Sequence, residues 1–160
     1  MQDLLFSFCK WIENTSVPTA VRNTLWGYPY VQLIHFSGLS LWVGTIAILD
    51  LRLLGLAGRR LSVTQLAEQL FPWTWTGLGI AVTGGFLLFS SIATTYFHNP
   101  AFQIKLLLVL LGVVYHVVVQ RSVGQWGQSP DTPTLAKLAG FMELALWISV
   151  ITAAVEIPNY

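Results

Sequence analysis

Charged residues are scarce in this chain. They make up 9% of its 160 residues, whereas a soluble domain carries about a quarter. The net charge of +1 offers no electrostatic basis for binding nucleic acid. The single cysteine, Cys9, excludes an internal disulfide. The remainder is largely apolar, with 54% hydrophobic residues, which indicates a one-domain membrane protein.

Four stretches are long and apolar enough to cross a bilayer, which takes roughly 20 helical residues. Pro29 precedes the first stretch and Pro72 the second, and both are expected to open their helices. Short connections favour antiparallel neighbours. We therefore expect an all-α membrane protein in which residues 29–160 form an antiparallel four-helix transmembrane bundle. The predicted spans are about 30–51, 73–97, 101–120 and 136–157.

Residues 1–28 have a different character, because apolar and charged side chains alternate there with helical spacing. This pattern predicts an amphipathic helix that lies in the outer membrane interface. The apolar face consists of Leu4, Leu5, Phe8, Trp11 and Ile12.

Basic residues indicate the orientation of the bundle. The loops at 51–72 and 121–137 carry Arg52, Arg59, Arg60, Arg121 and Lys137. The opposite side carries only Lys10 and Arg22. Because basic loops stay in the cytoplasm, we expect both termini on the outer side of a multi-pass protein.

Ionisable residues inside the predicted spans are candidate functional residues, because burying them in a membrane is unfavourable. Counted from the outer prolines, His35 and Lys105 lie roughly 8–9 Å below the same surface. Glu156 and His98 belong near this outer layer. His116 and Met142 match in depth further in, and Glu143 is next to Met142.

These residue types suit a b-type haem, which needs an axial imidazole, an apolar pocket and a cation for its propionates. His35 is the expected axial ligand and Lys105 the expected propionate partner. Gly38 and Trp42 share the helix face of His35, and a small residue there leaves room for a flat ligand. Gly112 lies between Lys105 and His116 on the third span.

The second axial ligand stays open. His98 is one candidate, and His116 with Met142 is a candidate second metal site.

Structural roles are alternatives for each of these residues. A histidine inside a bundle is often only a hydrogen-bond donor, a lysine near the surface can extend to it, and a methionine often fills a core. Glu143 is a possible partner of His116 or Lys137. Asp50 and Arg52 are a possible charge pair at the end of the first span.

Two segments resemble known families. "LIHFSGLSLWVG" resembles the first-helix signature of a superfamily of small bacterial four-helix membrane proteins, which includes the membrane domain of the copper-resistance protein D family. "FQIKLLLVLLGVVYH" resembles the third helix of the membrane protoporphyrinogen oxidase family. The stretch "LWGYPYVQLIHFSGLSLWVGTIAILDLRLLGL", with "PWTWTG", is closest to a bacterial membrane family without assigned function. Asp50-Leu51-Arg52 stands where the oxidase family has an arginine.

The resemblance implies the bacterial inner (cytoplasmic) membrane, and haem b bound through His35 with Lys105 and His116 in or near the site. We therefore expect a haem b-binding protein that transfers electrons or performs an oxidase-type reaction, with a quinone or porphyrin as substrate. Whether it is an enzyme stays open. The alternatives are an accessory subunit of a membrane complex and, ranked lower, a copper-handling protein, because cysteine and methionine are few. A glycine-rich second span makes a homodimer plausible.

Overall fold

The computed structural model describes residues 2–57, 60–127 and 133–159, and these residues form helices without any strand. The predicted all-α class is confirmed for this part of the chain. Arg59 lies outside the described residues. The elements are α1 (Gln2–Glu13), α2 (Ser16–Asn23), α3 (Gly27–Leu53), α4 (Val63–Ser91), α5 (Ala93–Phe97), α6 (Pro100–Trp126), α7 (Thr134–Glu156) and the 3₁₀ turn η1 (Ile157–Asn159).

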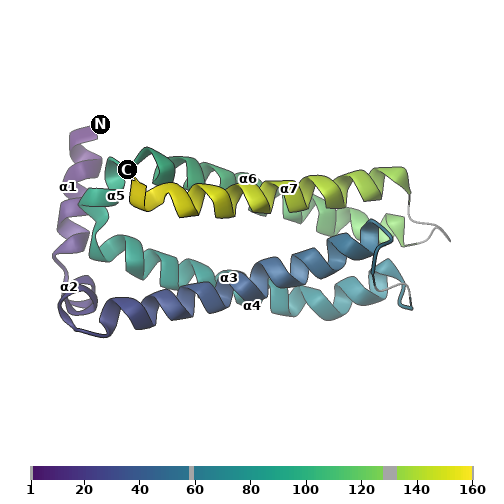
Figure 1. The fold of residues 1–160 in the computed structure, drawn as a ribbon, viewed down its shortest axis with the longest axis horizontal. Coiled ribbons are helices and arrows are strands. Elements are labelled where there is room, and N and C mark those ends of the chain that lie inside the picture. Colours follow the sequence, from purple (N-terminus) through teal and green to yellow (C-terminus); the bar gives the residue numbers. More distant parts are fainter. Residues whose placement is uncertain (1, 58–59, 128–132, 160) are drawn as a thin grey trace.

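The four long helices run along the same axis, and α1 crosses one end of them (Figure 1). We call this the terminal end, because α1 and the last turn of α7 both lie there. The last turns of α3 and α6 and the first turns of α4 and α7 lie at the opposite end, the loop end. Helix α3 packs along α4 and α6 packs along α7, and α3 also contacts α7. Helix α3 moves away from α7 toward the terminal end (Figure 1), where Phe89 of α4 instead stacks on Phe102 of α6 with ring centroids 5.5 Å apart.

Within the described part of the chain, three segments are long and apolar enough to cross a membrane: α3, α6 and Thr134–Asn159, which contains α7. This finding indicates a membrane protein. Helix α4 is equally long, but its glycines and threonines lower its hydropathy, and it is not among the three.

The second predicted span, 73–97, has different bounds in the structure, where it belongs to two helices. Helix α4 begins already at Val63, because Ser62 and Gln65 form a reciprocal cap. The Ser62 hydroxyl accepts from the Gln65 N–H at 3.1 Å, and the Ser62 N–H donates to the Gln65 side chain at 3.2 Å. Pro72 therefore lies inside α4 instead of opening it.

A break at Ile92 separates α4 from α5, and residues from the N-terminal helices stabilise it. Arg22 donates to the carbonyl of Ser91 at 2.7 Å, where α4 ends. The Glu13 carboxylate accepts from both the N–H and the hydroxyl of Thr94, at 2.9 and 2.7 Å, where α5 begins. Backbone groups left unpaired by the break thus gain partners.

The N-terminal segment forms two helices, α1 and α2, where the sequence predicts one. Cys9 is buried, whereas Leu4, Phe8 and Trp11 are exposed. Phe6 places its ring 5.7 Å from that of Phe97. One side of α1 thus packs on the bundle while apolar side chains remain uncovered.

Glycines allow α3 and α4 to approach at backbone distance. A Cβ atom at Gly77 would lie 2.6 Å from the backbone nitrogen of Trp42. A Cβ atom at Gly84 would lie 2.9 Å from the Cα of His35. Small residues permit this kind of close packing in membranes, where apolar burial alone drives little helix association. The glycines therefore set the position of α3 against α4.

Gly77→Ala is expected to lower the free energy of unfolding by about 1–3 kcal/mol, because the added methyl group meets the α3 backbone. Gly79→Ala is the control, since no atom lies within 4 Å of a Cβ there. That change should be neutral or stabilise by up to about 1 kcal/mol through helix propensity. Thermal unfolding in detergent measures both, and equal effects would contradict the packing account.

A pH dependence follows from Glu13. Burial raises the pKa of its carboxyl, but the Thr94 hydrogen bonds and the Arg22 charge outweigh this and hold the pKa below its ordinary value of 4.5. A lowered folded-state pKa contributes stability above that ordinary value, and this stability is lost as the pH falls through the folded pKa. The attachment of α1 should therefore loosen only in acid.

The reaction of Cys9 with dithiodipyridine, which proceeds in acid, measures this loosening. The rate should rise below about pH 4.5 in the wild type. Glu13→Gln should react faster at neutral pH, with a weaker pH dependence. Asp3→Asn, an exposed acid on the same helix, is the control and should behave as the wild type does. An unchanged rate in Glu13→Gln would refute this role.

Candidate functional site

His35 is held in one orientation by the backbone of the neighbouring helix. Its Nδ1 lies 2.7 Å from the carbonyl oxygen of Ala81. A carbonyl oxygen only accepts, so Nδ1 carries the proton and Nε2 presents a lone pair. Nε2 makes no hydrogen bond with any described residue. The imidazole is thus a fixed base with one available nitrogen.

Two glycines of α4 make room for this ring. A Cβ atom at Gly85 would lie 3.0 Å from Cε1 of His35 and 3.1 Å from Nδ1. Gly84 faces the backbone of His35 in the same way. Larger residues at these positions would displace the imidazole from the Ala81 carbonyl.

Lys105 on α6 is half-buried, and its charge acts on the His35 ring. This interaction agrees with the common outer layer that the sequence predicts for the two residues.

The other two residues expected in that layer, His98 and Glu156, make contacts of their own at the terminal end. His98 is exposed at the end of α5, where its ring packs against Phe6 and Phe97 with centroids 5.4 and 5.0 Å apart. Glu156 is exposed and accepts from the Asn159 amide at 2.8 Å.

Gly38, the glycine expected to leave room for a flat ligand, is a filled position. A Cβ atom there would lie 2.9 Å from the Cα of Ala81, so α4 occupies that side of α3. Gly112 is filled as well, since a Cβ atom there would lie 3.0 Å from the Trp147 ring. Both glycines serve helix packing, and the expectation of ligand space at Gly38 is wrong.

A second polar group lies deeper in the bundle. His116 Nδ1 and Glu143 Oε1 are 2.7 Å apart, and the two side chains are 1% and 0% exposed. His116 rather than Lys137 is thus the partner of Glu143. Met142 is 50% exposed on another face of α7. The structure does not bring its thioether to the His116 ring.

Asp50 joins this deeper group, although its sequence position indicates a charge pair with Arg52. Its side chain is fully buried, and neither carboxylate oxygen has a hydrogen-bond partner. Arg52 donates through Nε to the Leu61 carbonyl at 3.0 Å. Gly140 lets α7 approach, since a Cβ atom there would lie 3.1 Å from the Asp50 carbonyl oxygen. The charge of Asp50 on α3 interacts with that of Glu143, which lies on α7 as Gly140 does.

Aromatic rings enclose His116. Its centroid lies 5.1 Å from Trp42 and 5.9 Å from Trp75, both edge-on, and Phe71 lies 6.2 Å away. Trp42 in turn packs edge-on against Trp147 at 5.5 Å. Trp42, which the sequence associates with the His35 site, therefore belongs to the deeper group. A ring this enclosed leaves no space for a macrocycle at its Nε2.

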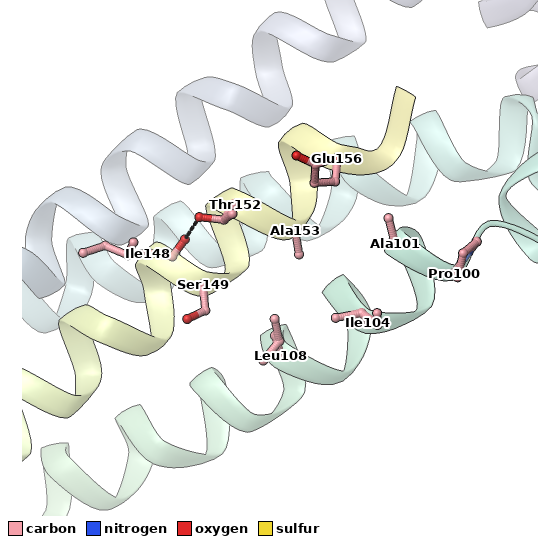
Figure 2. Close-up of a pocket in the computed structure, with 9 residues that line it drawn as sticks. All are labelled: Pro100, Ala101, Ile104, Leu108, Ile148, Ser149, Thr152, Ala153 and Glu156. Carbon is pink, nitrogen blue, oxygen red and sulfur yellow. Dashed lines mark hydrogen bonds between the residues drawn. The ribbon is translucent and has the colours of Figure 1, made fainter. Parts of the chain in front are cut away.

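Among the described residues, no group of three or more His, Cys, Asp or Glu side chains is arranged to hold a metal ion. A groove of about 580 Å³ lies between α6 and α7 at the terminal end. Figure 2 shows Ser149 and Ala153 of α7 pointing toward α6, and Leu108 of α6 pointing toward α7. Neither His35 nor His116 lines this groove, which is separate from both histidine sites.

Comparison with known proteins places the chain in a family. The model of a family of unknown function, DUF6644, matches residues 8–158, so the chain belongs to this family. No curated protein and no solved structure matches the chain.

Glu143→Leu is expected to destabilise the protein by about 1–3 kcal/mol, because it leaves a buried donor on His116 without its partner. The double variant Glu143→Leu/His116→Leu should lose less stability than the two single variants together. Unfolding in detergent measures all three variants. Strict additivity would show that the 2.7 Å contact carries no coupling energy.

Proposed function

We propose that this member of the family binds haem b in the membrane and transfers electrons, with His35 as an axial ligand. The hydrogen bond between His35 Nδ1 and the Ala81 carbonyl carries the proposal. Metal-binding histidines are commonly oriented by such a bond on one ring nitrogen, which directs the other at the metal. The available Nε2 of His35 fits this arrangement.

The surroundings of His35 also suit haem binding. The two buried apolar clusters begin at Trp42 and Leu49 on α3 and do not extend to His35. His35 is 9% exposed, whereas His116 is 1% exposed. A planar cofactor therefore meets less packed protein at His35 than at His116.

Each residue of this site has a distinct task. His35 would occupy one axial position, the α4 glycines would keep its ring in place, and Lys105 would neutralise a propionate. Haem supplies one-electron chemistry when bound. His98 faces aromatic rings at the surface and His116 is enclosed, so we assign only His35 as a histidine ligand. A quinol or a porphyrinogen is a suitable electron donor to the haem, because both dissolve in the membrane.

The proposed arrangement in the membrane has four crossing helices: α3, α4, α6 and α7. The packing of α4 along α3 supports its inclusion. The described basic residues Arg60, Arg121 and Lys137 lie toward the loop end, which supports a cytoplasmic loop end in a bacterial inner membrane. The exposed Leu4, Phe8 and Trp11 support an interfacial position for α1 at the outer surface.

The test is an optical spectrum of the purified protein, oxidised and dithionite-reduced, after expression with ample haem. The wild type should show a b-type Soret band and a reduced α band. His35→Ala should lose both, whereas His98→Ala, the matched control, should retain them. Lys105→Gln should retain the bands and bind haem more weakly, because one propionate loses its counter-charge.

Two outcomes would contradict the proposal. A colourless wild type would refute haem binding and favour an accessory subunit of a membrane complex. An unchanged spectrum in His35→Ala, with the fold confirmed by circular dichroism, would refute His35 as the ligand.

A further inference from the structure

Unpaired polar atoms concentrate at one place in the bundle. In the described residues, six buried side-chain nitrogen or oxygen atoms lack a hydrogen-bond partner. All six belong to the deeper group of polar residues, which we call the buried polar cluster: Trp42, Asp50, His116, Glu143 and Trp147. Buried polar atoms in folded proteins are nearly always paired, so such a concentration requires a ligand or water between them.

The chemistry of these atoms identifies what they can hold. Donors are the indole N–H groups of Trp42 and Trp147, and acceptors are both Asp50 oxygens and Oε2 of Glu143. His116 Nε2 takes either role, depending on its protonation. A mixed set of donors and acceptors suits water, which uses two to four polar partners.

The charges of the cluster require a bound proton. Asp50 and Glu143 interact with one another, and both are fully buried. Two unneutralised carboxylates at such a position would be strongly unfavourable, since even one buried charge requires a partner. His116 is hydrogen-bonded to Glu143 alone. A neutral His116 ring carries one proton. The cluster therefore holds at least one further proton, on His116 or on a carboxyl group.

Other titratable groups on the surrounding helices do not replace this proton. Lys137 on α7, Arg121 on α6 and Glu68 on α4 are exposed. Tyr115 on α6 donates its hydroxyl to the Ala139 carbonyl at 3.3 Å. Arg52 on α3 directs its Nε to the Leu61 carbonyl.

We propose that Asp50, Glu143 and His116 form an intramembrane proton-binding site, bridged by water, that exchanges protons with the loop end. Asp50 lies three residues before the end of α3 at Leu53, so it is the member nearest that end. Trp42 packs edge-on against both Trp75 and Trp147 next to the cluster, with ring centroids 5.5 Å apart in each pair.

Transfer of a proton from Asp50 to Glu143 needs no reactant other than the bridging water. The acid form of Asp50 releases its proton to a bridging water, which passes one of its own protons to the Glu143 carboxylate. Asp50 becomes a carboxylate and Glu143 a neutral acid, while the total charge stays constant. Asp50 then takes up a proton from a hydronium ion at the loop end, which becomes water, and both carboxyl groups are then neutral. This inference does not depend on haem at His35.

Infrared spectroscopy of the full chain in lipid vesicles tests the site. A protonated carboxyl group gives a C=O band that carboxylates lack and that shifts down in D₂O. The wild type should show this band at neutral pH. At least one of Asp50→Asn and Glu143→Gln should remove it, and both changes keep the shape of the side chain. Glu156→Gln, an exposed acid on α7, is the control and should leave the band unchanged.

The wild-type spectrum alone can overturn the proposal, so the test does not depend on whether a variant folds. Absence of the band at neutral pH means that the carboxyl groups hold no proton. A band that persists in both amide variants places the proton elsewhere. Failure of the band to shift in D₂O would show that the site does not exchange protons. Loss of the band in one amide variant identifies the acid that carries the proton.

Discussion

The backbone contact between α3 and α4 is the constraint on which the rest of the structure depends. It exists because Gly77 and Gly84 leave no side chain between the helices. This proximity places the Ala81 carbonyl at hydrogen-bond distance from His35. The same contact sets Trp42 against α4, where it packs edge-on against Trp75. One packing relation thus orients the outer imidazole and closes the deeper cluster.

The bundle separates two kinds of polar chemistry along its length. Toward the terminal end, His35 presents a nitrogen near a half-buried cation, which suits a redox cofactor. Toward the loop end, Asp50, Glu143 and His116 are fully enclosed, which suits protons and water. Burying such groups in a membrane requires partners, and the aromatic rings between the two levels keep them distinct.

Much of the fold was predictable, because apolar runs indicate long helices directly, although Pro72 misplaced the start of α4. The charge interaction between His35 and Lys105 was also predictable, since equal depth follows from helical rise. The break at Ile92 was not, because it depends on Arg22 and Glu13 from a distant part of the chain. Asp50 was assigned to the membrane surface for a related reason: sequence position gives depth, but burial against α7 depends on tertiary contact. The space at glycines was misjudged because spacing does not show what fills it.

The central claim is that His35 Nε2 binds the haem iron, and rescue by imidazole tests it most directly. His35→Gly removes the ligand and leaves a cavity that imidazole can occupy. The account predicts that this variant, incubated with haem, gains a b-type spectrum only when imidazole is added. A spectrum that forms equally well without imidazole, or that imidazole cannot restore in a folded variant, would contradict it.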